Sequence, residues 1–141
     1  MADQKDLVRR FYKEVFENHN LAAVDDLLTE GAIDHQNPPP GLKVKPGREG
    51  VKEVISVYLE AFNPLSVQIL DQYQDGDTVI TRAQYTGTHS GSFAGIPATG
   101  KVSTVEGIDI TRFEGDRQAE HWGQFDVVGM LTQLGVIPPM G

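Results

Sequence analysis

Apolar residues in the first half of the chain recur at intervals of three and four, which is the spacing of amphipathic helices. The first apolar stripe consists of Leu7, Val8, Phe11, Tyr12, Val15 and Phe16. A second helix is expected after Asn20, a residue type that caps helices, with Gly31 as its stop signal. A third fits residues 48–62, because Asn63-Pro64 does not continue a helix. The pattern predicts three helices at the start of the chain.

Beyond these helices, apolar residues alternate with polar ones, as they do in a strand with one buried face. The alternation starts at Leu65, Val67 and Ile69, and turns rich in Gly and Asp divide it into later strands at residues 78–88, at residues 101–113 and after Gly115. Helices followed by a meander of strands indicate an α+β fold, with helices on one face of an antiparallel sheet. At 141 residues, the chain is expected to form a single domain over residues 1–141.

The composition excludes several classes of function. There are no cysteines, so disulfides, thiol nucleophiles and thiolate metal sites are excluded. The formal net charge is -8, with 12 Lys and Arg residues and no basic run, which argues against binding to nucleic acid. No apolar run approaches the roughly 20 residues of a membrane span, and the first residues lack the apolar core of a signal peptide. We therefore expect a cytoplasmic protein with neither nucleic acid nor membrane as a partner.

Both faces of the long strands carry apolar side chains. Val102, Ile108 and Ile110 fall on one face, and Val105 and Phe113 fall on the other. A sheet with one face in water would alternate more cleanly between apolar and polar residues. We therefore expect helices and a pocket to cover one face, and a second copy of the chain to cover part of the other face in a homodimer.

Asp126 is a carboxylate in the apolar segment that ends the last strand, among Trp122, Phe125 and Val127. If this strand packs into a core, the loss of water raises the pKa of the carboxyl toward the range useful for proton transfer. Alternatively, Asp126 caps the apolar segment 127–134 by accepting a hydrogen bond from a backbone N–H. The residues alone leave both interpretations open.

Three segments give the chain a resemblance to a known family. They are Asp34-His35-Gln36-Asn37-Pro38, the run from Gly87 to Lys101 that contains Gly-Thr-His-x-Gly-x-Phe-x-Gly, and the ending with Trp-x-x-x-Asp at Trp122 and Asp126. With the order of elements, which covers nearly the whole chain, they resemble the SnoaL-like polyketide cyclases, or ester cyclases, of the nuclear transport factor two-like superfamily. The resemblance implies a curved antiparallel sheet that forms a cone, closed by three N-terminal helices around one deep pocket.

The resemblance also implies an activity. Characterised cyclases of this kind close a ring of an aromatic polyketide by intramolecular aldol condensation, and the Asp that matches Asp126 is taken as the acid and base. A proton on carbon between carbonyl groups is already acidic, so one positioned carboxylate can remove it and later return a proton to the new alkoxide. We expect a cofactor-independent lyase or isomerase that acts on a hydrophobic carbonyl or polyketide-like small molecule.

His35 and His89 each lie next to a loop rich in Gly and Pro, and such loops would border the mouth of the pocket. There a neutral imidazole can donate a hydrogen bond to a developing enolate oxygen, so both are candidate catalytic residues. The alternative is a surface histidine or a structural hydrogen bond. No histidines are spaced as a metal-binding pair, and no metal site is expected. His121 alternates with Trp122, which predicts that it lies on the opposite face.

Four residues are candidates for contacting the substrate. Trp122 shares strand parity with the candidate acid, and Tyr12 lies on the first helix, although either aromatic residue can instead fill the core. Glu106 falls near the candidate acid if the last hairpin pairs Ile108 with Trp122, and a one-residue change of register moves it to the other face. Arg82 has the same ambiguity.

Two other classes of function stay open. An epoxide hydrolase-like enzyme, or another pocket enzyme that activates water, would need Arg82 or Arg112 to converge with Asp109 and Asp126. A non-catalytic module for small-molecule binding and dimerisation would need no such arrangement.

The strand before the last hairpin also departs from the cyclase pattern, since it offers Asp109, Thr111 and Arg112 where cyclases often carry a histidine or another polar residue.

Overall fold

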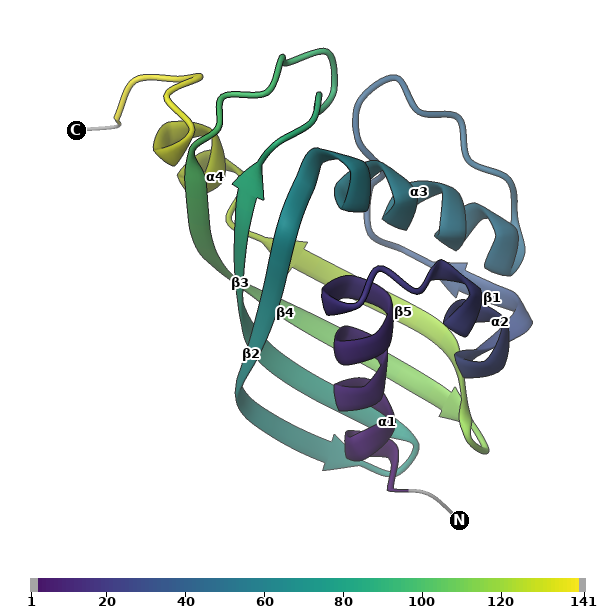
Figure 1. Cartoon of the computed structure of the whole chain (residues 1–141). Helices are drawn as coiled ribbons and strands as arrows, with labels where there is room; N and C mark the ends of the chain where they lie inside the picture. Colours follow the sequence, from purple (N-terminus) through teal and green to yellow (C-terminus); the bar gives the residue numbers. More distant parts are fainter. Residues whose placement is uncertain (1–2, 140–141) are drawn as a thin grey trace.

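The computed structural model describes residues 3–139 and shows a curved sheet with helices against one of its faces (Figure 1). In chain order the elements are α1 (Gln4–Phe11), the π-helical segment η1 (Tyr12–Glu17), the 3-10 turn η2 (Leu21–Ala23), α2 (Val24–Leu27), β1 (Leu28–Asp34), α3 (Gly47–Ala61), β2 (Phe62–Asp75), β3 (Thr78–His89), β4 (Val102–Glu114), β5 (Arg117–Phe125) and α4 (Val127–Gln133). The predicted α+β class is confirmed. The bounds of α3, β3 and β4 differ from the predicted ones by no more than one residue.

The strands form one sheet in the order β1-β5-β4-β3-β2. From β2 to β5 each strand pairs antiparallel with the next, as the meander predicted. The sheet curves around α1, α2 and α3, which lie on its inner face (Figure 1). The curved sheet closed by helices, which the family resemblance implied, is confirmed.

The edge strand β1 is a correction to the sequence analysis, which expected a helix stopped by Gly31. The helical segment is short and ends at Leu27, and the strand that follows includes Gly31. Asn20 precedes this segment without a side-chain capping bond. β1 pairs parallel with β5, with Asp34 opposite His121. Such a pairing depends on a partner far away in the sequence, so the local apolar pattern did not show it.

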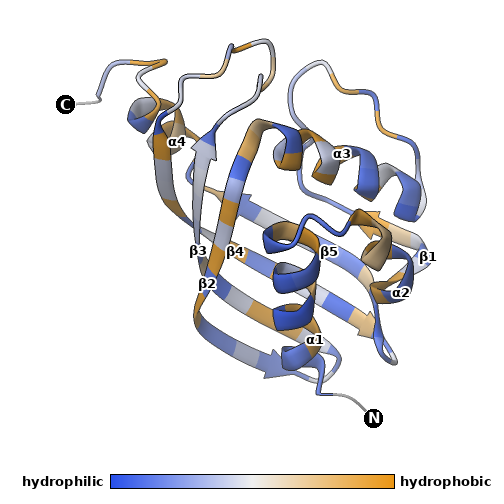
Figure 2. Cartoon of the chain, viewed as in Figure 1, coloured by the Kyte–Doolittle hydropathy of each residue, from blue (hydrophilic) through white to orange (hydrophobic). Residues whose placement is uncertain are grey.

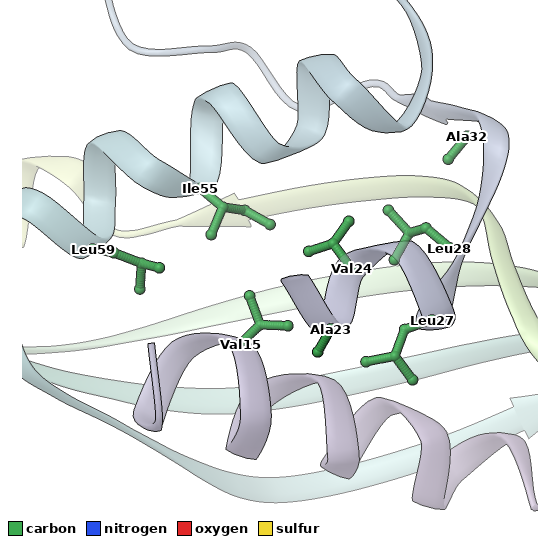
Figure 3. Packing of buried hydrophobic residues seen from close by; sticks show 8 residues of the cluster. All are labelled: Val15, Ala23, Val24, Leu27, Leu28, Ala32, Ile55 and Leu59. Atoms are coloured by element: carbon green, nitrogen blue, oxygen red, sulfur yellow. The ribbon is translucent and has the colours of Figure 1, made fainter. Parts of the chain in front are cut away.

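Two groups of buried side chains hold the helices on the sheet. One lies between η1, α2 and α3, and Figure 3 shows Val15, Leu27 and Ile55 pointing into the space between these helices. The other joins α1 to the sheet through contacts that include Val8 and Phe113. Burial of a large apolar side chain contributes about 1.5–3 kcal/mol, so packing rather than intrinsic propensity stabilises these short helices. Figure 2 shows the alternating hydrophobic and hydrophilic positions along the strands.

A third buried group lies at the far end of the sheet. Phe93 of the loop after β3 packs there with Phe62 of β2 and with Met130 of α4. The loop and α4 therefore close the end of the sheet that α1 leaves open. Among residues 3–139, no helix is long and apolar enough to cross a membrane.

Candidate active site

A cavity of about 170 Å³ lies between the helices and the inner face of the sheet. Most of its wall is apolar, with side chains such as Phe11, Phe16, Ile55 and Leu65 from the helices and from β2. Charged residues from β1, β4 and β5 also line it. The deep pocket expected from the family resemblance is thus confirmed, and an apolar cavity with a few polar groups is typical of a small-molecule site.

Asp109 is the central charged residue of this cavity. It lies on β4, on the inner face of the sheet, because the alternation along the strand puts it on the same side as the buried Val105 and Phe113. The hydroxyl of Tyr12 donates to Asp109 Oδ2 over 2.6 Å, and the hydroxyl of Tyr85 donates to the same oxygen. The other carboxylate oxygen, Oδ1, lies 2.8 Å from His121 Nε2. The side chain of Asp109 is 14% exposed.

His121 bridges two carboxylates. Its Nδ1 lies 2.8 Å from Asp34 Oδ1, and its Nε2 contacts Asp109. The parallel pairing of β1 with β5 brings Asp34 beside His121, and the backbone N–H of His35 donates to the carbonyl oxygen of His121 over 2.8 Å. The backbone N–H of Gln36 donates to Asp34 Oδ1 over 3.0 Å and so helps to orient that carboxylate. We call Asp34, His121 and Asp109 the inner cluster.

The charges of the inner cluster stabilise one another. Burial raises the pKa of Asp109, but the hydrogen bond and charge of His121, with the hydrogen bonds from Tyr12 and Tyr85, outweigh it and hold the pKa below its usual value. Burial lowers the pKa of His121, but hydrogen bonds to Asp109 and Asp34, and the charges of both carboxylates, raise it overall to about 10. At neutral pH the cluster therefore holds an imidazolium between two carboxylates.

The two tyrosines near Asp109 stay protonated. Burial, and then the charge of Asp109, raise the pKa of both Tyr12 and Tyr85 well above the usual value. Their hydroxyls therefore remain hydrogen-bond donors across the physiological range. The site thus offers an ionised carboxylate that can accept a proton, held in position by three donors.

The structure places Asp126 outside the cavity, contrary to the desolvated position considered above. Its side chain is exposed, and Oδ1 accepts a hydrogen bond of 2.8 Å from the backbone N–H of Gly129, as the N-cap of α4. The strand ends at Phe125, so Asp126 is not carried into the core. The capping interpretation is the one that the geometry supports, since Asp126 is exposed and bonded to the first turn of α4.

His89 lies at the end of β3 rather than in a loop at the mouth of the pocket, and its side chain is fully buried. Its Nδ1 accepts a hydrogen bond of 3.2 Å from the backbone N–H of Thr99 and lies 3.0 Å from Thr99 Oγ1. Its ring packs against Phe62, with the centroids 5.4 Å apart. His89 does not line the cavity, so its geometry corresponds to the structural alternative.

His35 and Trp122 stack on each other outside the cavity. Their ring centroids are 4.8 Å apart and their planes differ by 9°. His35 Nε2 lies 2.6 Å from Glu120 Oε2, while Trp122 is 38% exposed on the outer face of the sheet. His121 does lie on the face opposite Trp122, as predicted, but the cavity is on the side of His121. The expected contact of Trp122 with the pocket was therefore wrong.

Arg82 and Glu106 also lie on the outer face. Arg82 forms ion pairs with Asp71 and Glu106, at 2.7 and 2.5 Å. The last hairpin pairs Ile110 with Trp122, two residues from the register considered above. A shift of two residues keeps every side chain on its face, so Glu106 lies on the outer face because it alternates with the buried Val105 and Gly107. Neither residue reaches the cavity, because side chains at these positions of β3 and β4 point away from the helices.

The arrangement required for the epoxide hydrolase alternative does not form. Arg112 pairs with Glu120 and Glu114 instead of Asp109. Asp109 lines the cavity, whereas Asp126 caps α4 outside the cavity wall, so the two carboxylates do not converge. Within residues 3–139 there is also no group of three or more His, Asp or Glu side chains arranged to hold a metal ion.

Tyr12 is the one candidate substrate-contacting residue that lies in the cavity wall. The inner cluster, which Tyr12 adjoins, was not predicted from the sequence. Two signals pointed to it: Asp109 occupies an inward position among apolar residues of β4, and His121 has the parity opposite to Trp122. The contribution of Asp34 had no local signal, because it depends on the unpredicted strand β1.

The chain belongs to a known family. The chain matches the family model of the SnoaL-like polyketide cyclases over residues 6–134 and is a member of that family. It is 28% identical over 144 residues to the aklanonic acid methyl ester cyclase DnrD of Streptomyces peucetius. The aligned region covers 96% of this chain and 92% of DnrD. It is 32% identical to IdmH of Streptomyces antibioticus, with a TM-score of 0.80 over 96% of this chain and 100% of IdmH.

A more distant structure shares the fold alone. A protein from Catenulispora acidiphila with a ketosteroid isomerase-like fold is 19% identical, with a TM-score of 0.74 over 94% of each chain. Sheet curvature and helix placement are thus common to proteins whose sequences differ widely. The chemistry of this chain must be argued from its own side chains.

Proposed function

We propose that the protein closes a ring by an intramolecular aldol reaction within a hydrophobic carbonyl compound, with Asp109 as the acid and base and without a cofactor. The observation that supports this most directly is the ionised Asp109 in an apolar cavity, where Tyr12, Tyr85 and His121 donate to it. A carboxylate has about four acceptor positions, so these donors orient the group and leave one position for a substrate proton. The acid–base role suggested for Asp126 is thereby assigned to Asp109.

The reaction balances in protons. Asp109 takes a proton from carbon between two carbonyl groups, and the electron pair moves onto a carbonyl oxygen as an enolate. The enolate carbon then attacks a second carbonyl carbon of the same molecule, which forms the new C–C bond and an alkoxide. Asp109 returns its proton to that alkoxide. The apolar wall holds the folded substrate in position, which lowers the entropic part of the barrier.

The low pKa of Asp109 is compatible with this role. When Asp109 takes the proton, its negative charge passes to the enolate, and the imidazolium of His121 stays close to that charge. The cation that lowers the proton affinity of Asp109 therefore also stabilises the enolate. Because the carbon between two carbonyl groups is already acidic, a base of modest strength is sufficient.

Two further observations agree with the proposal, one on a relative and one on the cavity. DnrD, which matches nearly all of this chain, is an aklanonic acid methyl ester cyclase, and the family model that the chain matches is that of polyketide cyclases. The open cavity also argues against the alternative of a pocket filled by side chains, which a module used only for dimerisation would have.

The first step can be tested without the natural substrate. The carbon between the carbonyl groups of an aryl β-keto ester exchanges its hydrogen for deuterium in D₂O, and NMR measures the rate. We expect the protein to accelerate this exchange and Asp109→Asn to reduce the acceleration by at least 100-fold, since general base catalysis contributes roughly 10²–10⁴-fold. Asp126→Asn is the matched control and should keep the rate. Wild-type exchange in Asp109→Asn would refute the proposal.

We also propose that the protein is a homodimer that uses the outer face of the sheet. Tyr73, Ile80, Ile110 and Trp122 form a row of apolar side chains on four neighbouring strands, each opposite the next. Tyr73 is 62% exposed and Ile108, beside the row, is 51% exposed. Such a patch is typical of an interface. Light scattering coupled to size-exclusion chromatography should give twice the mass of the chain, and a Trp122→Arg variant should be monomeric.

The cytoplasmic location remains a prediction.

A further inference from the structure

The proposed reaction places negative charge on a substrate oxygen, and stabilising that charge requires a hydrogen-bond donor. The donors around Asp109 are already engaged. Tyr12 and Tyr85 donate to Asp109 Oδ2, and the imidazolium of His121 donates from one nitrogen to Asp109 and from the other to Asp34. The donor for the substrate oxygen must therefore come from another part of the cavity wall.

Gln36 lies at the required place. It belongs to the loop after β1, and it lines the cavity together with Asp109 and His121. A Cβ atom added to Gly123 would lie 2.5 Å from Gln36 Oε1, 2.6 Å from Asp109 Oδ1 and 2.7 Å from His121 Cε1. All three side chains therefore converge over the bare α-carbon of Gly123. The carboxamide of Gln36 is thus held beside the base.

The carboxamide of Gln36 is free to contact a ligand. Its backbone N–H is fixed by the bond to Asp34, but within residues 3–139 its side chain has no hydrogen-bond partner. A half-buried polar group without a partner is unfavourable unless a ligand or water meets it. An amide carries two N–H donors, and a 180° turn of the group exchanges its oxygen and nitrogen. Nitrogen can therefore face the substrate without any change in the backbone.

We propose that Gln36 is a catalytic residue that binds the reacting oxygen of the substrate. Its Nε2 donates a hydrogen bond to the carbonyl oxygen next to the carbon that Asp109 deprotonates, and this bond strengthens as the oxygen becomes an enolate. The ligand class is an enolisable carbonyl compound. The inference rests on the proposed function, because only an enolising substrate develops this charge.

The test uses 4-nitrophenolate as a probe. Its oxygen shares negative charge with a conjugated system, as an enolate oxygen does, and its ionisation is seen in the visible absorption. Asp109→Asn reproduces the neutral state of the base after it has taken the proton. This variant should bind the phenolate at least 10-fold more tightly than the wild type, because the wild-type carboxylate repels the anion.

In the Asp109→Asn background, a second substitution isolates Gln36. Gln36→Leu should weaken phenolate binding by about 10-fold, the effect of one lost hydrogen bond to a charged group. Gln68→Leu is the matched control, because Gln68 is exposed on β2, outside the cavity wall, and this change should leave the Kd as it was. Gln36→Glu, which replaces the donor with a carboxylate, should also weaken binding by at least 10-fold at neutral pH.

The outcomes separate the two ideas. If Asp109→Asn binds the phenolate no more tightly than the wild type, the role of Asp109 as base fails, and the role of Gln36 fails with it. If Asp109→Asn binds more tightly but neither Gln36→Leu nor Gln36→Glu changes the Kd, the assignment of Gln36 is overturned and the proposed function stands. Gln36→Glu provides the answer where Gln36→Leu does not fold.

Discussion

The two faces of the sheet carry clusters with the same chemistry and different surroundings. On the inner face His121 lies between Asp34 and Asp109, with the three side chains 25%, 24% and 14% exposed. On the outer face Arg82 lies between Asp71 and Glu106, with side chains 46%, 41% and 53% exposed. We call the second set the outer cluster. In each, one cation joins two carboxylates from neighbouring strands.

Burial determines what each cluster does. Water screens the outer charges, so their attraction contributes little to stability. The inner charges lie beside an apolar cavity, where each depends on its partners for stabilisation, and this dependence is what shifts the pKa of His121 and Asp109. Removing one member of the inner cluster is therefore costly, because the remaining charges lose their partner. For the same reason a bound substrate can change the protonation of Asp109. Similar residues therefore form weak surface ion pairs in the outer cluster and a candidate catalytic site in the inner cluster.

The largest expected difference between the clusters follows from removing the cation. His121→Asn leaves two carboxylates close together with only one amide between them, and we expect a loss of about 3 kcal/mol in the free energy of unfolding at pH 7. Arg82→Gln leaves its carboxylates in water and should not change stability measurably. Urea unfolding of both variants measures the difference. Equal losses in the two variants would mean that burial does not distinguish the clusters.

The pH dependence of stability should also separate the clusters. The pKa of His121 is raised from 6.5 to about 10, so its contribution is complete below about pH 6.5 and is lost as pH rises through about 10. The pKa of Asp109 is lowered from 3.8, so its contribution is present above that value and is lost as pH falls. The inner cluster is therefore most stabilising between about pH 4 and 6.5. Urea unfolding at pH values below, within and above this range measures the losses on both sides.

Substitution shows which cluster causes this dependence. His121→Asn should remove the alkaline decline between about pH 6.5 and 10, because the group that titrates is gone, whereas Arg82→Gln should retain it. NMR of the imidazole of His121 gives an independent measurement, with titration expected near pH 10. A titration near the ordinary value of 6.5 would contradict the charged inner cluster.

The outer face of the sheet shows what the local apolar pattern of the sequence could predict and what it could not. The apolar spacing predicted α3, β3 and β4 because those elements bury one regular stripe, which is local information. The same alternation predicted that His121 and Trp122 lie on opposite faces. It could not say which face holds the cavity, and the choice of the Trp122 side made Trp122, Arg82 and Glu106 appear as site residues.

The inner cluster required information that is not local. Asp34 joins His121 only because β1 pairs in parallel with β5, and a parallel pair joins segments that are distant in the chain. Tyr85 and Tyr12 meet at Asp109 from a strand and a helix that are far apart in sequence. Family resemblance supplied the fold and the pocket, but it directed attention to Asp126, whose neighbours in the sequence are apolar and whose surroundings in the structure are solvent.

Asp126 is the third test of the comparison, with the smallest expected effect. It is exposed and bonded to the backbone N–H of Gly129, so it resembles the outer cluster rather than the inner one. Asn caps a helix about as well as Asp, so Asp126→Asn should leave the thermal midpoint unchanged, whereas Asp126→Ala should cost about 1 kcal/mol. Both variants should keep the rate of deuterium exchange. A variant that stays folded but loses the exchange activity would return the base to Asp126 and leave the inner cluster a structural role.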